Sequence, residues 1–271
     1  MKWICYEDQT TPRLGRLEGE QVYPLLETER AVVSGLFEKS PSSREGAPLK
    51  LSTLKLYPPL LRPSKIICVG LNYRDHAEEQ NKPIPQQPLL FFKASNCVIG
   101  HQGKVVHPGT PHLLDYEVEL GVVIGKGGAK IPKEQAAQHI FGYTIFLDMT
   151  ARDCQKSDGQ WFRAKSFATF GPMGPFIREI EKGEETPSLE LELWVNGELR
   201  QKSNTRHLIF DIPFLISYIS HIIPLETGDL ISTGTPAGVG VFRNPPVYLQ
   251  PHDKITARIE TLGTLEVEIS S

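Results

Sequence analysis

Short apolar runs, each followed by a turn, are the feature that most constrains the fold of this chain. Two of them, Leu189–Val195 and Glu198–Gln201, flank the dipeptide Asn196-Gly197. Asn-Gly between two alternating runs is typical of a type I′ hairpin turn, because both residues accept a positive φ. The 23 glycines and 22 prolines supply further turns. The pattern predicts a mostly β (α+β) fold with a rolled or barrel-like core and short peripheral helices.

The other apolar runs extend this pattern along the chain. We expect further strands at Lys2–Tyr6, Leu14–Leu17, Gln21–Leu25, Lys65–Gly70, Leu89–Phe92, Tyr116–Ile124, Phe141–Leu147, Leu230–Thr233, Lys254–Ile259 and Leu265–Ile269. Helical spacing is convincing only at Lys133–His139 and Pro213–Ile223. Asn72 is suited to cap a short helix that starts just after it.

Prolines divide the chain near residue 60. Ser40–Pro48 predicts a polar loop, and Tyr57–Ser64 contains several prolines. Because proline lacks an amide donor and pushes the preceding residue toward extended geometry, regular strand pairing should stop there. We therefore expect a small N-terminal β-rich domain at residues 1–60 and a larger domain at residues 61–271.

Charge and hydropathy exclude several classes of protein. The 29 Lys and Arg residues against 32 Asp and Glu residues give a net charge of −3, so we expect no nucleic-acid partner and no membrane held by bulk charge. No apolar run approaches the ~18 residues that a spanning helix needs. Acidic Glu7 and Asp8 oppose a signal peptide. The four cysteines form no Cys-x-x-Cys pair, and we expect reduced thiols in a cytoplasmic protein.

Three carboxylates near two predicted strands suggest a metal site. Glu117 and Glu119 lie on one face of a strand, because side chains alternate along it, and Asp148 ends the next apolar run. Buried carboxylates repel one another and lose hydration, and a cation relieves both costs. Three oxygen ligands favour a hard ion such as Mg²⁺, with Mn²⁺ or Ca²⁺ as substitutes. Two alternatives stay open: a solvent-facing acidic strand, and a helix-capping role for Asp148.

Three further segments carry residues suited to catalysis. His76 and Glu79 are neighbours on a helix, where a carboxylate fixes the imidazole tautomer and leaves one nitrogen to move a proton; a chance surface pair is the alternative. Lys165 is flanked by aromatic residues and could hold a carboxylate or an enolate, or lie along an apolar patch. The glycine-rich segment Thr233–Gly240 suits a loop that lines a pocket.

Five segments in this order resemble the fumarylacetoacetate hydrolase superfamily across residues 65–271. They are Gly70-Leu71-Asn72-Tyr73-Arg74-Asp75-His76, Asp115-Tyr116-Glu117-Val118-Glu119-Leu120-Gly121, Asp148-Met149-Thr150-Ala151-Arg152-Asp153, Ala164-Lys165-Ser166-Phe167 and Thr233-Gly234-Thr235-Pro236-Ala237-Gly238-Val239-Gly240. Two more, residues 79–83 and 240–249, resemble the branch called fumarylacetoacetate hydrolase domain-containing protein 2 and its bacterial relatives.

The resemblance implies a mixed β-sandwich roll of the family's C-terminal-domain type, a catalytic domain at residues 61–271 and a homodimer. It also implies site residues. Mg²⁺ or Mn²⁺ would be held by Glu117, Glu119 and Asp148; a lid would carry His76 and Glu79; Lys165 would be the active-site lysine; Gln155 and Thr235 would touch the substrate.

The resemblance further implies chemistry on small 2-oxo acids through an enolate. The leading interpretation is enol–keto tautomerisation of a 2-oxo dicarboxylate, with oxaloacetate the sharpest version, or its decarboxylation. The second is C–C hydrolysis of a β-diketo acid such as an acylpyruvate or fumarylacetoacetate. Leu71 stands where some acylpyruvate-cleaving members carry Arg. Two remote alternatives are a non-catalytic metal-binding protein and a carboxylate-cluster phosphodiesterase.

Overall fold

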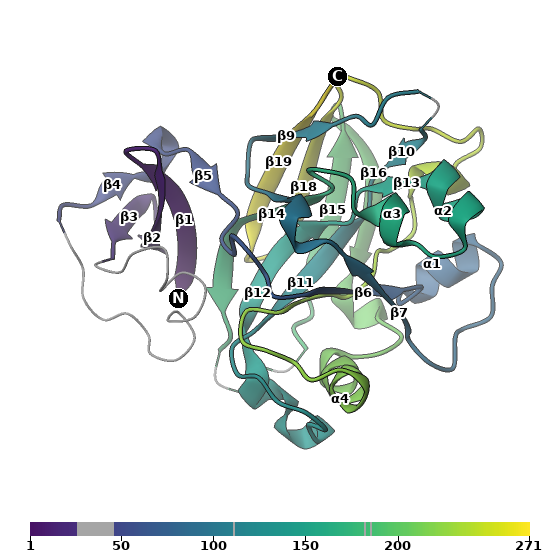
Figure 1. Ribbon diagram of the computed structural model, residues 1–271, viewed down its shortest axis with the longest axis horizontal. Helices are drawn as coiled ribbons and strands as arrows, with labels where there is room; N and C mark the ends of the chain where they lie inside the picture. Colours follow the sequence, from purple (N-terminus) through teal and green to yellow (C-terminus); the bar gives the residue numbers. More distant parts are fainter. Residues whose placement is uncertain (26–45, 111, 182, 185) are drawn as a thin grey trace.

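Sheets of three sizes build the protein. The computed structural model describes residues 1–25, 46–110, 112–181, 183–184 and 186–271 (Figure 1). Within these residues a twelve-stranded sheet is accompanied by a five-stranded sheet and a two-stranded one. The helices are short and peripheral, which confirms the predicted mostly β fold.

The large sheet contains both N-terminal and central strands. Its order is β4 (Leu49–Lys50), β3 (Gln21–Pro24), β2 (Thr11–Glu18), β1 (Lys2–Asp8), β14 (Gly171–Glu179), β12 (Ile140–Leu147), β11 (Val118–Ile124), β17 (Leu230–Ser232), β6 (Ile66–Gly70) and β7 (Leu89–Lys93). In addition, β5 (Leu56–Tyr57) pairs with β1, and β8 (Val98–Ile99) pairs with β14.

The remaining elements surround this sheet. The five-stranded sheet has the order β16 (Glu198–Asn204), β15 (Glu190–Val195), β18 (Lys254–Ile259), β19 (Gly263–Ser270) and β9 (Gly103–Val106). The pair β10 (Leu114–Asp115) and β13 (Thr150–Ala151) is separate. The α-helices are α1 (Arg74–Glu79), α2 (Arg152–Asp158), α3 (Phe162–Lys165) and α4 (Ile212–Ile222). Figure 1 shows β1–β5 on one flank and α1–α3 on the opposite flank.

The main core lies between the two larger sheets. Strand β11 sends Val118, Leu120 and Val122 into the same buried cluster as Leu191 and Leu193 of β15. The strand is buried on both faces, and the opposite face carries Glu119 and Val123. Alternation along β11 therefore separates an apolar face from a face with an acidic side chain, as period-two geometry requires.

The N-terminal strands join the central sheet. Strand β1 pairs with β14 at Lys2↔Arg178 and Trp3↔Ile177. The polar loop predicted at Ser40–Pro48 falls mainly on residues 26–45, which lie outside the described residues. Among the helices of the described residues, none is long and apolar enough to cross a membrane.

Local predictions agree with the structure at the hairpin and at α4. Asn196 and Gly197 have φ values of 51° and 81°, the positive values that a type I′ turn needs. Helix α4 begins after Asp211, whose carboxylate accepts a hydrogen bond from the amide of Phe214. Both devices act within a few residues, so the sequence pattern could identify them.

The helix predicted at Lys133–His139 is present with these bounds as a 3₁₀ helix, in which the amide of Gln135 donates to the carbonyl of Pro132 three residues earlier. One local prediction was wrong. Asn72 does not cap α1, which begins after Tyr73. Instead the Asn72 carboxamide donates to the carbonyl of Thr233 (2.8 Å) and accepts from the amide of Phe210 (2.8 Å), tying α1 to the segment after β17.

Candidate active site

Antiparallel pairing brings three carboxylates together. Val118 of β11 lies opposite Leu147 of β12, and the amide of Asp148 donates to the carbonyl of Glu117 (2.9 Å). One ligand oxygen from each of Glu117, Glu119 and Asp148 lies within 4.8 Å of the others, and all three residues are buried. Asp148 does not cap α2, which begins after Ala151 without a side-chain cap. The three acidic side chains therefore form a buried cluster and do not lie on a solvent-facing side of a strand.

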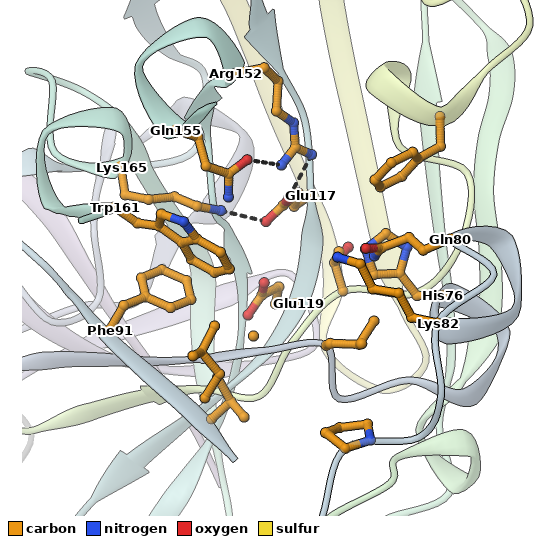
Figure 2. A pocket seen from close by; sticks show the side chains of 17 residues that line it. His76, Gln80, Lys82, Phe91, Glu117, Glu119, Arg152, Gln155, Trp161 and Lys165 are labelled. Atoms are coloured by element: carbon orange, nitrogen blue, oxygen red, sulfur yellow. Dashed lines mark hydrogen bonds and ion pairs between the residues drawn. The ribbon is translucent and has the colours of Figure 1, made fainter. Parts of the chain in front are cut away.

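Two cations hold Glu117 from either side. Lys165 Nζ lies 2.8 Å from Glu117 Oε2 and 2.7 Å from Asp148 Oδ2, and it is itself buried. Arg152 Nη2 lies 2.6 Å from Glu117 Oε1, while its Nε donates to Asp115 (2.8 Å). Figure 2 shows Arg152 and Lys165 reaching Glu117. Lys165 is thus an ion-paired core lysine and does not lie along an apolar patch.

A third buried cation, Lys93, completes the cluster. Its Nζ lies 2.7 Å from Asp148 Oδ1 and donates to the carbonyl of Met149 (3.1 Å). The sequence patterns did not point to Lys93, Arg152 or Asp115 as site residues. Asp115 and Arg152 nevertheless lie inside two of the five segments that carry the family resemblance. With every group ionised, the cluster has one more negative than positive charge, counting the acids Asp115, Glu117, Glu119 and Asp148 against the bases Lys93, Arg152 and Lys165.

The pKa values of Glu117 and Glu119 are shifted in opposite directions. Burial opposes ionisation of Glu117, but Lys165 and Arg152 outweigh it and lower its pKa to about 2. Burial raises the pKa of Glu119 to about 8, and the nearby charges of Asp148 and Glu117 add to the shift. Glu119 is therefore the carboxyl of the pair whose ionised form the cluster stabilises least.

Glu119 receives only neutral donors among the described residues. Ser232 Oγ donates to its Oε2 (2.5 Å), and the amide of Gly234 donates to the same oxygen (2.8 Å). A cation bound between Glu119, Glu117 and Asp148 would neutralise the surplus charge. All three side chains offer oxygen donors, the set that hard divalent ions prefer. The chemistry of the cluster therefore fits a divalent metal ion.

A histidine–carboxylate pair contributes His76 to the pocket, across from Glu117 and Glu119 (Figure 2). His76 Nδ1 lies 2.8 Å from Glu79 Oε2, and Glu79 Oε1 accepts a hydrogen bond from the amide of Gly238 (2.9 Å). The ring of His76 packs edge-on against Phe242, with centroids 5.8 Å apart. Because Nδ1 is engaged with Glu79, Nε2 is the nitrogen left for a substrate. The pair is buried against the pocket and is not a surface pair.

The glycine-rich segment fastens helix α1 to the site. Gly238 has φ +104°, and a Cβ there would meet the carbonyl oxygen of Arg200 at 2.1 Å, so only glycine fits. Asp75 of α1 accepts from Ser203 Oγ and from the amide of Ala237 (3.3 Å). Together with the Glu79 contact, these bonds hold α1 against residues 233–240 and against β16.

The remaining expected site residues also line the pocket. Gln155 Oε1 accepts from Arg152 Nη1 (2.9 Å), which leaves its amide nitrogen to donate to a ligand. Thr235 Oγ1 donates to the carbonyl of Val118 (3.0 Å) and accepts from Gln201 Nε2 (2.8 Å), so its hydroxyl hydrogen is already used. A fixed Thr235 can therefore offer a ligand its methyl group and a lone pair.

The pocket has a volume of about 330 Å³, at the small end of ligand pockets, which span about 300–1,000 Å³. Its lining combines the groups above with aromatic and polar side chains. These are Phe91, Trp161, Phe242, Gln80 and Lys82. Gln80 and Lys82 lie on the same side as His76 (Figure 2). The pocket thus suits a small polar ligand between a carboxylate wall and a histidine wall.

Comparison with known proteins places the chain in a family. A family model described as fumarylacetoacetate (FAA) hydrolase C-terminal matches residues 65–270. The chain belongs to the fumarylacetoacetate hydrolase family. Members of this family among its relatives include Bacillus subtilis oxaloacetate tautomerase YisK, 47% identical over 85% of this chain and 78% of the relative. Human mitochondrial oxaloacetate tautomerase FAHD2A is 41% identical over 80% of this chain and 70% of the relative.

Solved structures of the fumarylacetoacetate hydrolase family have the same fold. Fumarylacetoacetate hydrolase (EaFAH) from Exiguobacterium antarcticum superposes with a TM-score of 0.88 and is 36% identical. The match covers 100% of this chain and 99% of that structure. The predicted roll of the fumarylacetoacetate hydrolase type is therefore confirmed, and the chain is a member of an enzyme family.

Proposed function

We propose that the chain is a divalent-metal-dependent tautomerase that interconverts the enol and keto forms of a small 2-oxo dicarboxylic acid, with oxaloacetate as the substrate. One observation carries the proposal: one small pocket is lined both by Glu117 and Glu119, which cluster with Asp148, and by His76, which is paired with Glu79. The similarity to oxaloacetate tautomerases of Bacillus subtilis and human supports the choice of substrate.

In this proposal Glu117, Glu119 and Asp148 hold Mg²⁺ or Mn²⁺, with Ca²⁺ as a substitute. The raised pKa of Glu119, which a bound cation would lower, and the all-oxygen donor set support a divalent ion of this kind. When bound, the ion supplies Lewis-acid stabilisation of negative charge on the enol oxygen of the substrate. Lys93, Arg152 and Lys165 fix Glu117 and Asp148 in position through ion pairs.

His76 is proposed to move the proton between carbon and solvent. In the keto-to-enol direction its Nε2 accepts a proton from the methylene carbon and releases it to solvent, while solvent supplies a proton to the carbonyl oxygen; the reverse direction returns both protons. Glu79 is a positioning residue that keeps the Nδ1 side of the ring engaged. The Gly238 amide in turn fixes Glu79. These two contacts therefore orient Nε2 of His76 toward the pocket.

The other lining groups are proposed to bind the two carboxylates of the substrate. Lys165 lines the pocket beside Glu117 and would hold the enolate or a carboxylate there. Gln155 can donate a hydrogen bond to the substrate from its amide nitrogen. The fixed side chain of Thr235 lines the pocket. On the opposite side Lys82 offers a positive charge to the second carboxylate. Cations at both ends explain a preference for a dicarboxylate.

The test follows the ultraviolet decay of enol-oxaloacetate with Mg²⁺ and then with EDTA, while pyruvate is assayed in the same tube. We expect metal-dependent loss of the enol without pyruvate. A His76→Asn variant should lose this activity, whereas His221→Asn, which changes an exposed histidine on α4, should keep it. Pyruvate formation would identify a decarboxylase, and no metal-dependent change would reject the substrate.

Hydrolysis of a β-diketo acid is the second candidate. The similarity to a fumarylacetoacetate hydrolase structure favours it, because the same pocket could direct an activated water at a carbonyl carbon. The two activities separate in one experiment, since hydrolysis of an acylpyruvate releases two carboxylate products and tautomerisation releases none. A metal-binding protein without turnover would give neither result.

Three further expectations remain proposals. We propose that residues 1–60 form a small supporting domain and residues 61–271 the catalytic domain, since the family match begins at residue 65. We also propose a homodimer and a cytoplasmic location, as the sequence suggested. Light scattering of the purified protein tests the homodimer, and fractionation of the cells that make the protein tests its location.

A further inference from the structure

A second cluster of metal-ligating side chains lies outside the pocket lining. His112 precedes β10, while Asp153 and Cys154 belong to the first turn of α2. His112 Nδ1 lies 2.8 Å from Asp153 Oδ2 and 3.5 Å from Cys154 Sγ, and that sulfur lies 3.4 Å from Asp153 Oδ2. One atom from each residue therefore points to a common centre. The activity proposed above uses none of the three residues.

The spacing of these atoms matches the edges of a tetrahedral zinc site. Zinc binds sulfur at about 2.3 Å and histidine nitrogen at about 2.0–2.1 Å, so tetrahedral angles place the two ligands about 3.5 Å apart. The observed sulfur–nitrogen and sulfur–oxygen distances are 3.5 and 3.4 Å. Only the 2.8 Å nitrogen–oxygen contact must widen, by about 0.5 Å, which a rotation of the imidazole ring provides.

Burial and charge around the cluster also suit a metal ion. The Cys154 side is buried, whereas the side chains of His112 and Asp153 are 20% and 28% exposed, which leaves an approach for the ion and a water as fourth ligand. Arg163, the nearby cation that acts on Cys154, is paired with Asp158 at 2.6 Å. Its repulsion of an incoming ion is therefore reduced.

We propose that His112, Asp153 and Cys154 bind Zn²⁺ at a site separate from the catalytic carboxylates. The ligands are the imidazole Nδ1, a carboxylate oxygen and the thiolate sulfur. The Sγ–H bond of Cys154 breaks as the zinc–sulfur bond forms, and the proton passes to solvent. A thiolate and an imidazole select zinc over Mg²⁺, which prefers the oxygen ligands of the catalytic cluster.

The site would brace the wall of the pocket. The amide of Leu113 already donates to Asp153 Oδ1 (2.9 Å), and the amide of Arg152 donates to the carbonyl of Leu113 (2.9 Å). Zinc would add a third link between the segment before β10 and α2. Helix α2 carries both Arg152 and Gln155, which line the pocket. Zinc would therefore fix these two residues without touching the substrate.

Cobalt reports on the site directly. Co²⁺ is added to the full-length protein with Mg²⁺ present in excess, and the cobalt–thiolate charge-transfer band in the near ultraviolet is recorded. We expect the band in the unaltered chain and its loss in Cys154→Ser. The matched control is Cys68→Ser, which removes a buried thiol near the catalytic acids and should keep the band. The carboxylate cluster contains no sulfur, so failure of the proposed activity would not affect this result.

A second variant guards against misfolding of the first. His112→Gln changes a partly exposed side chain and should weaken zinc binding at least tenfold in competition with a chromogenic chelator, with an unchanged circular dichroism spectrum. Absence of the cobalt band in the unaltered chain would overturn the proposal. So would a band that survives Cys154→Ser, or zinc affinity unchanged in His112→Gln, because the three residues would then form only a hydrogen-bonded turn.

Discussion

The two walls of the pocket are built in different ways. The carboxylate wall comes from the central strands β11 and β12, and its charged groups, Glu117, Asp148 and Lys165 among them, are buried and joined by ion pairs of 2.7–2.8 Å. The opposite wall is α1, a helix of six residues attached through the side chains of Asp75 and Glu79. The first wall is part of the core, and the second is fastened to it.

This difference separates two tasks. Metal ligands need a fixed geometry, and side chains that project from packed strands provide it. A proton-moving group must meet a substrate that enters and leaves, and a short helix with few attachments can open at low cost. We expect substitutions in the carboxylate wall, here called the strand wall, to affect both stability and metal binding. Substitutions in the wall formed by α1, here called the helix wall, should affect turnover alone.

Asp148→Ala should have the largest effect. The change leaves Lys93 and Lys165 buried without their shared partner, which costs on the order of 3–5 kcal/mol of unfolding free energy. It also removes a metal ligand, so metal-dependent turnover should disappear. Thermal denaturation and Mg²⁺ titration measure the two losses. Asp148→Asn, which keeps the shape, controls for the missing volume. Normal turnover in Asp148→Ala would show that the strand wall holds no essential metal.

His76→Asn should lower turnover by about 10²–10⁴-fold, the usual contribution of a general acid or base, without changing Mg²⁺ affinity. Glu79→Gln should have a smaller effect, because it leaves the imidazole in place and only weakens its orientation. The measurements are the turnover rate at saturating substrate and Mg²⁺ binding by calorimetry. A parallel loss of metal affinity would mean that the two walls are not independent.

The metal-free protein should lose stability as the pH rises from about 5 to 8. The folded-state pKa of Glu119 is raised to about 8 from an ordinary 4.5, so its stabilising contribution is complete at low pH and is lost as the carboxyl ionises. Melting temperatures in EDTA should fall by roughly 5–10 °C over this range. Glu119→Gln, which cannot ionise, should flatten the profile. A flat profile in the unaltered chain would contradict the assigned pKa.

Lys82→Met should have the smallest effect. This exposed lysine on the helix side would bind one substrate carboxylate through a screened charge pair, which is worth about 0.2–1 kcal/mol. We expect a two- to fivefold rise in KM with kcat unchanged, using about 1.4 kcal/mol per tenfold change. The rise should shrink at high salt. Lys130→Met, a second exposed lysine away from the pocket lining, is the control.

Sequence patterns predicted the parts of this molecule that depend on neighbours along the chain. Alternation in the segment of β11 separated Val118 and Leu120 from Glu119, and Asn196-Gly197 located a hairpin. Spacing along the helix paired His76 with Glu79. Each of these relations spans only a few residues, where periodicity and turn chemistry are informative.

The parts that sequence reasoning missed depend on contacts between distant segments. Lys93 ends an ordinary-looking strand, and its partner Asp148 lies 55 residues further along. Arg152 pairs with Asp115 across 37 residues. Asn72 is a residue type suited to cap a helix, yet it lies one residue before the cap position, and its carboxamide is used by Thr233 and Phe210. Tertiary pairing decides such roles, and no local pattern contains that information.

The contact of β1 with β14 has a consequence for how the chain can be shortened. Because Lys2 and Trp3 pair with Arg178 and Ile177, the first strand covers one edge of the sheet that carries β12 and β11. A chain that begins after β5 would present the backbone of β14 as an open edge, a template on which other chains can add strands. The N-terminal layer therefore protects the enzyme from aggregation through its sheet, whatever else it does.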